Sequence, residues 1–218
     1  MIPEQLTQFG GGDIFSLSGS MALGAIHPIS LILNSIFAAG FATSAVAGER
    51  QRGTLEVLLA RPLSRRTVYL TLLISVLGFV AVAALASIVG ATIGSAVAGV
   101  AGELVPGRLP FFWLNAVLLF GAIAAVGLAA SVSFDRLTPA IGITVGFTVV
   151  SYVLEVLGTF WPDAKGLQAY SVFHYFNAKQ VLEGHVETGN LVLLAAVAAV
   201  AIVWALVEFP RRDLAAPS

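Results

Sequence analysis

A run without a single charged residue, from 67 to 102, most limits what this chain can fold into. Four more apolar segments, at 24–47, 111–134, 137–157 and 191–207, are each long enough to cross a bilayer as a helix, which takes about 17–25 residues. Only 11% of the residues are charged, whereas soluble domains average about 25%. The sequence therefore predicts an all-α, polytopic helical membrane protein with about five transmembrane helices.

The segment 67–102 is longer than one crossing requires. As a continuous helix it would measure roughly 54 Å, against a hydrocarbon core of about 30 Å. Two interpretations stay open: a tilted helix that projects beyond the membrane, or a break near Gly90. Gly90, Gly94, Ala98 and Gly102 are spaced four apart, which is typical of a small-residue face for close helix packing.

The remaining segments connect the spans within a single domain, 1–218. We expect 1–23 to be an external segment with a short interfacial helix near 14–17, and 158–189 to be external with an amphipathic helix at 167–182. The loop 48–66 and the tail 208–218 fall on the opposite side.

Lysine and arginine counts orient these segments, because positive residues are enriched in short cytoplasmic loops. One side holds eight of the eleven: Arg50, Arg52, Arg61, Arg65, Arg66, Arg136, Arg211 and Arg212. The other holds three: Arg108, Lys165 and Lys179. We therefore expect a multi-pass protein of the cell membrane whose basic loop, 135–136 turn and C-terminus are cytoplasmic, with residue 1 outside.

Within the basic loop, leucines fall at helical spacing. Leu55, Leu58 and Leu59 share one helix face, and Arg52, Thr54 and Glu56 lie away from that face. Pro62 disfavours helical geometry in the residue before it, and Ser64 is a suitable N-cap for the next helix. These features predict a short amphipathic helix over 50–60, which either anchors the loop at the lipid headgroups or docks on a partner.

The stretch 48–65 resembles the cytoplasmic loop of type 2 ATP-binding-cassette (ABC) transporter permeases. The resemblance is carried by Glu49, Gly53, Thr54, Leu55, Glu56, Leu58, Leu59, Pro62, Ser64 and Arg65. The tail residues Phe209, Arg211, Arg212, Asp213 and Leu214 resemble the end of many members. The family's segment before its last span resembles the part of this chain that contains Ser171, Phe173, Tyr175, Phe176 and Gly184.

The resemblance implies that the loop helix is a coupling helix that docks on a separate ATPase subunit. The partner-binding residues it implies are Glu49, Arg52, Gly53, Thr54, Leu55, Glu56, Leu58, Leu59 and Pro62. It also implies a second permease copy, either identical or different, and export of a substrate that residue type does not identify. Because the family has six spans and this loop follows the first one, we expect the family's first transmembrane helix to be missing here.

The sequence contains no phosphate-binding GxxxxGK[ST] motif, so we expect ATP and Mg²⁺ to be bound by the partner subunit and no cofactor by this chain. No nucleophile–base pair indicates catalysis, and we expect no metal site and no nucleic-acid partner. Glu155, near the outer end of its span, is either a residue that reaches water or an intramembrane functional group. The alternative function is a secondary transporter, channel or scaffold that does not use ATP, with the basic loop as a topology anchor.

Overall fold

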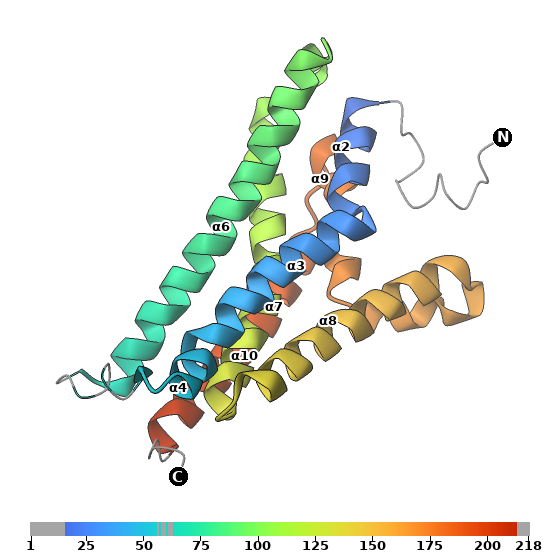
Figure 1. Cartoon of the computed structure of the whole chain (residues 1–218). Helices are drawn as coiled ribbons and strands as arrows, with labels where there is room; N and C mark the ends of the chain where they lie inside the picture. Colours follow the sequence, from blue (N-terminus) through green and yellow to red (C-terminus); the bar gives the residue numbers. More distant parts are fainter. Residues whose placement is uncertain (1–15, 56, 58–59, 61–62, 213–218) are drawn as a thin grey trace.

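The computed structural model describes residues 16–55, 57, 60 and 63–212, and their regular structure is helical. Among them, five helices are long and apolar enough to cross a membrane: Pro28–Gln51, Arg65–Val97, Pro106–Ser133, Leu137–Phe160 and Thr188–Arg211. Figure 1 shows these helices as a bundle, with one of them diverging from the others. The predicted all-α, polytopic membrane fold is confirmed.

The first long helix begins with a corner. Helix α2 (Leu17–Ile26) ends at His27, where the backbone turns to ψ 134°, and α3 (Pro28–Thr43) then begins with proline in its first turn. The Nδ1 atom of His27 accepts a hydrogen bond from the backbone N–H of Ile29 at 3.3 Å. Helix α2 is present from Leu17 onward, where the expected helix near 14–17 was to end, and the expected span 24–47 is divided at His27. Residues 1–15 lie outside the described part.

The long apolar run forms one continuous helix, α6 (Arg65–Val97). The predicted cap is confirmed: the side chain of Ser64 accepts the N–H of Thr67 at 3.0 Å. The helix passes through Gly90 without a break and ends before Gly99, whose φ is +76°. A Cβ added at Gly90 or Gly94 would meet nothing within 4 Å, so this small-residue face packs closely against no other part of the described chain.

Helix α7 (Leu109–Ser133) is the centre of the bundle. It follows two short 3-10 turns, η2 (Ala101–Glu103) and η3 (Pro106–Arg108). It packs against α3, α6, α8 and α10, and 78% of the residues in its most apolar 18-residue stretch are buried. Its alanines and glycines allow this close approach, since they present little side chain to the neighbouring helices.

Helix α8 (Leu137–Phe160) is followed by an irregular segment in place of the single amphipathic helix expected at 167–182. The segment consists of η4 (Pro162–Tyr170), η5 (Phe173–Tyr175) and α9 (Ala178–Glu183), before the last span, α10 (Thr188–Arg211). The prediction was wrong because Ser171, Val172 and Phe173 are all buried. A helix lying on a surface buries one stripe and cannot bury three consecutive residues.

Candidate functional site

The loop after the first long helix is folded against the bundle, and the helix predicted over 50–60 is interrupted. Helix α3 continues through a π-helical turn, η1 (Ser44–Gly48), into α4 (Glu49–Gln51). The chain then turns at Gly53, whose φ of +73° is a conformation that favours glycine. Thr54 is not helical, and helical geometry returns at Leu55 and Val57. The predicted docking helix is therefore divided by the Gly53 turn.

The turn brings three of the predicted partner-binding residues together. The N–H of Thr54 donates to the backbone oxygen of Glu49 at 3.0 Å, and its hydroxyl donates to the Glu49 carboxylate. Arg52 forms an ion pair with Glu49 at 3.2 Å. Because these contacts are local, they shape the turn and leave the Arg52 side chain 66% exposed. The other predicted residues Glu56, Leu58, Leu59 and Pro62 lie outside the described residues.

Leu55 and Val57 present opposite sides of the segment after the turn. Leu55 is 2% exposed and belongs to the main apolar core, whereas Val57 is 70% exposed. Residues i and i+2 of an α-helix are separated by about 200° around the helix axis, which accounts for the difference in exposure between Leu55 and Val57. Leu55 thus anchors the loop, and the Val57 side chain on the other side is mostly exposed.

Ser131 of α7 holds the π-helical turn from the side. A π-helix shifts the backbone hydrogen bonds from i→i+4 to i→i+5 and leaves donors to be satisfied elsewhere. The Ser131 hydroxyl accepts the N–H groups of Val46 at 3.1 Å and Ala47 at 2.8 Å, and it donates to the backbone oxygen of Thr43 at 2.7 Å. All four residues are buried. The π-helical turn that leads into the loop is therefore fastened to the most buried helix of the bundle.

Four charged residues tie the loop to the ends of other spans. Asp135, in the connection between α7 and α8, forms ion pairs with Arg50 at 2.7 Å and with Arg212 at the end of α10. Arg212 also donates to the backbone oxygen of Val132 at 2.7 Å, and its own backbone oxygen accepts from Arg65.

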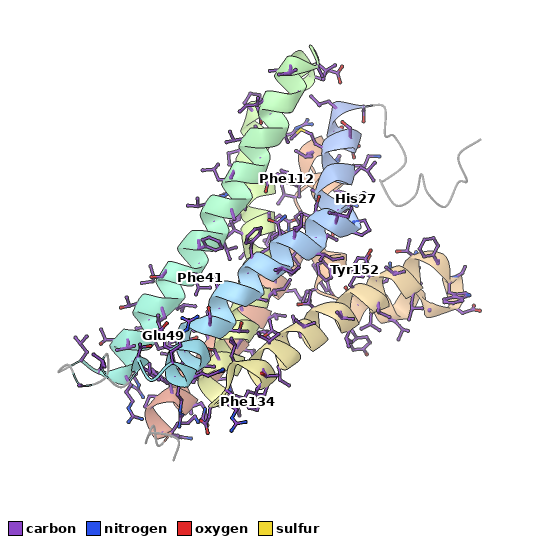
Figure 2. All side chains as sticks on the ribbon, viewed as in Figure 1. His27, Phe41, Glu49, Phe112, Phe134 and Tyr152 are labelled. Carbon is purple, nitrogen blue, oxygen red and sulfur yellow. The ribbon has the colours of Figure 1, made fainter. Side chains whose placement is uncertain are left out.

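These contacts place the loop, the 135–136 turn and the end of α10 at one end of the bundle, as the arginine distribution predicts. Figure 2 shows Glu49 and Phe134 at this end. Which side of the membrane this end faces stays a prediction.

Gln51 makes the most direct contact between the loop and α8. Its Oε1 atom accepts the backbone N–H of Leu137, the first residue of α8, at 3.1 Å. This donor has no partner within its own helix, as at every helix N-terminus.

Neither Gln51 nor Ser131 was among the predicted site residues, and Asp135 was interpreted mainly as a turn. The one available signal was the charge of Asp135 between two apolar spans. The sequence does not indicate that Gln51 bonds to Leu137 or that Ser131 bonds to the turn at 43–47.

At the opposite end of α8, Glu155 lies in a polar cluster. Gln168 donates to its Oε1 atom at 3.1 Å, and Nδ1 of His174 lies 3.5 Å from its Oε2 atom. The Glu155 side chain is 26% exposed. It lines a cavity of about 510 Å³ between α8, the segment that follows it, and Ile26 and Leu31 of the first helices. The residue thus has protein partners and also borders open space.

Comparison with known proteins matches almost the whole chain to one family. The model of the ABC-2 family transporter protein matches residues 2–214. A search of curated proteins returned no match. Membrane subunits of this family in general work with an ATPase subunit and in pairs. The chain belongs to the ABC-2 transporter family and is a multi-pass membrane permease of an ABC transporter.

Proposed function

We propose that this permease forms the membrane pathway for ATP-driven export and docks a separate ATPase subunit through the loop that begins at Glu49. The ATPase binds ATP and Mg²⁺, and two permease copies complete the transporter. The observation that carries this proposal is the two-sided loop segment, with Leu55 buried in the core and Val57 and Arg52 exposed. A partner that covers the exposed side would act on a segment fixed to three spans.

Seven of the ten basic residues in the described part of the chain lie at this same end: Arg50, Arg52, Arg65, Arg66, Arg136, Arg211 and Arg212. Positive residues on one side favour a cytoplasmic position for that side, which is where an ATPase would meet the loop. Docking is useful for transport only if the ATPase binds the loop differently in its nucleotide-bound and nucleotide-free states. The proposed cycle therefore works by moving the loop, while this chain performs no catalysis.

A second cavity supports a pathway beside α3 and α6. It measures about 490 Å³ and is lined by residues of α2, α3, α6 and α7, none of which is charged. Its polar groups are the serine hydroxyls and the amide of Asn34. We propose that substrate passes through this outer half of the bundle, and residue type leaves the identity of the substrate open.

Co-purification tests the docking proposal. The permease is co-expressed with candidate Walker-type ATPase subunits from the same organism, in wild-type form and with Val57→Asp. The charge should reduce the retained ATPase at least about tenfold, which corresponds to ~1.4 kcal/mol. Val105→Asp is the matched control, because Val105 is also an exposed valine, 47% exposed, in a loop at the other end of the bundle.

Equal retention by wild type and Val57→Asp would contradict docking through this loop. No retention by wild type would favour the alternative, a channel, scaffold or secondary transporter that does not use ATP. The family match favours the ATP-driven interpretation.

A further inference from the structure

The structure points to α8 as the span that the docking loop moves. Gln51 and Arg50 are the positioning residues that transmit the movement of the loop to the start of α8. We infer this from three observations, which concern the inner end of α8, a close contact about two turns further along, and its outer end. The inference rests on the proposed function, because it requires a partner that displaces the loop.

At the inner end, the loop contacts α8 directly. Gln51 accepts the N–H of Leu137 at 3.1 Å, and Arg50 pairs at 2.7 Å with Asp135, two residues before the helix begins. The Arg50 side chain is only 9% exposed and the Asp135 side chain 52% exposed, so the arginine end of this pair is shielded from solvent and salt. A displacement of Arg50 and Gln51 therefore displaces the start of α8.

About two turns from its inner end, α8 makes a close contact with the bundle, and this contact serves as a pivot. Gly127 of α7 lies where a Cβ would come within 3.1 Å of the Ala42 Cβ and 3.3 Å of the Thr144 Cγ2. Thr144 is fully buried, and only a glycine at 127 lets α3, α7 and α8 approach this closely. This close contact holds Thr144 in place, and in the proposed movement it is the pivot about which the two ends of α8 change angle.

Toward its outer end, α8 diverges from α3, as Figure 1 shows. Only 17% of the residues in the most apolar 18-residue stretch of α8 are buried. The cavity of about 510 Å³ separates the outer half of α8 from Ile26 and Leu31. The outer half thus has room to approach the first helices. Gln168 of η4 donates to Glu155 and Thr159, so η4 is bound to this half and would move with it.

The pivot divides α8 unequally. From Thr144 the inner arm to Leu137 is about 10 Å and the outer arm to Phe160 about 24 Å, at ~1.5 Å per residue. A displacement of about 2 Å at Leu137 would become roughly 5 Å at Phe160. In this way a small movement of the loop changes the width of the outer cavity.

Distance measurements between spin labels test the lever. The chain contains no cysteine, so Phe160→Cys on α8 and Val192→Cys on α10 can be labelled selectively; both positions are exposed. Labelled permease is diluted with unlabelled permease, so that the distance is measured within one chain. The complex with the ATPase is compared without nucleotide and with ATP, Mg²⁺ and orthovanadate. We expect a shift of roughly 5 Å, from the arm lengths above.

Gln51→Met removes the acceptor for Leu137 and should abolish this shift in complexes that still contain the ATPase, whose amount is measured in the same samples. Gln51→Glu keeps an acceptor oxygen at a helix N-terminus, where negative charge is favourable, and should restore the shift. An unchanged shift in Gln51→Met, or a wild-type complex in which Phe160 does not move, would overturn the inference and leave docking intact. A wild-type permease that retains no ATPase would overturn both.

Discussion

The hydroxyl of Ser131 lies 2.8 Å from the backbone nitrogen of Ala47, which precedes it by 84 residues. This bond and its two companions use the full capacity of a serine hydroxyl, which is one donor and two acceptor sites. The π-helical turn next to the docking loop therefore persists because α7 satisfies the backbone groups that the turn leaves unpaired. The π-helical turn and the central helix are joined at this point, and Arg50 and Gln51 lie beyond the junction.

Replacing Ser131 by alanine should destabilise the protein more than its small volume change suggests. The backbone N–H groups of Val46 and Ala47 would lose their partner in a buried site, which costs roughly 1–3 kcal/mol. Ser75→Ala is the matched control, because the Ser75 hydroxyl is exposed and bonds within its own helix at 2.9 Å. Thermal unfolding in detergent measures both, and an equal melting temperature for the two variants would show that Ser131 does not hold the turn.

The ion pairs of Asp135 should contribute more than the other pair at this loop. Asp135→Ala leaves Arg50, whose side chain is 9% exposed, without this carboxylate. Arg52→Ala instead removes a pair with Glu49 in which the arginine is 66% exposed, and exposed pairs contribute about 0.2–1 kcal/mol. We expect Asp135→Ala to lower the melting temperature clearly and Arg52→Ala to change it little. The reverse order would mean that Asp135 only forms the turn.

Gly158 is required for η4 to fold back on α8. A Cβ at this position would lie 2.2 Å from Cγ and 2.7 Å from Cδ of Gln168. Gly158→Ala should therefore displace Gln168 from Glu155 and cost about 1–3 kcal/mol through overpacking. In Gly146→Ala, on the same helix, the Cβ meets nothing within 4 Å, so that variant should retain wild-type stability. Faster proteolysis within 162–170 in Gly158→Ala alone would support the assignment.

The lengths of the apolar spans and the residue that caps α6 could be predicted from the sequence, because each depends on neighbouring residues. The positions of the spans follow from runs free of charge, and Ser64 follows from its place before a new helix. The sequence also contained the interruption of the docking helix, since Gly53 lies within the expected 50–60 helix. The leucine spacing favoured a continuous helix, and the turn formed because Thr54 bonds back to Glu49.

What the sequence could not indicate are contacts that depend on the packing of distant helices. Ser131 is a small polar residue in an apolar helix, and Gln51 is one polar residue among many in a basic loop. Their roles arise only when α7 and α8 are brought beside the loop. Similarly, the chain departs from α-helix at Val172 and Phe173 because the bundle buries these consecutive residues, and periodicity alone does not show this.

Cysteine labelling tests the orientation that the arginine distribution predicts. Because the chain has no native cysteine, each introduced one reports a single position. Leu63→Cys, at a site that is 49% exposed beside the basic loop, should react with a membrane-impermeant maleimide only after the cells are opened. Tyr170→Cys, at a 79% exposed site in η4, should react in intact cells; Ser171 is unsuitable because it is fully buried. The opposite pattern would place the loop outside, where no ATPase could reach it, and would overturn the proposed docking.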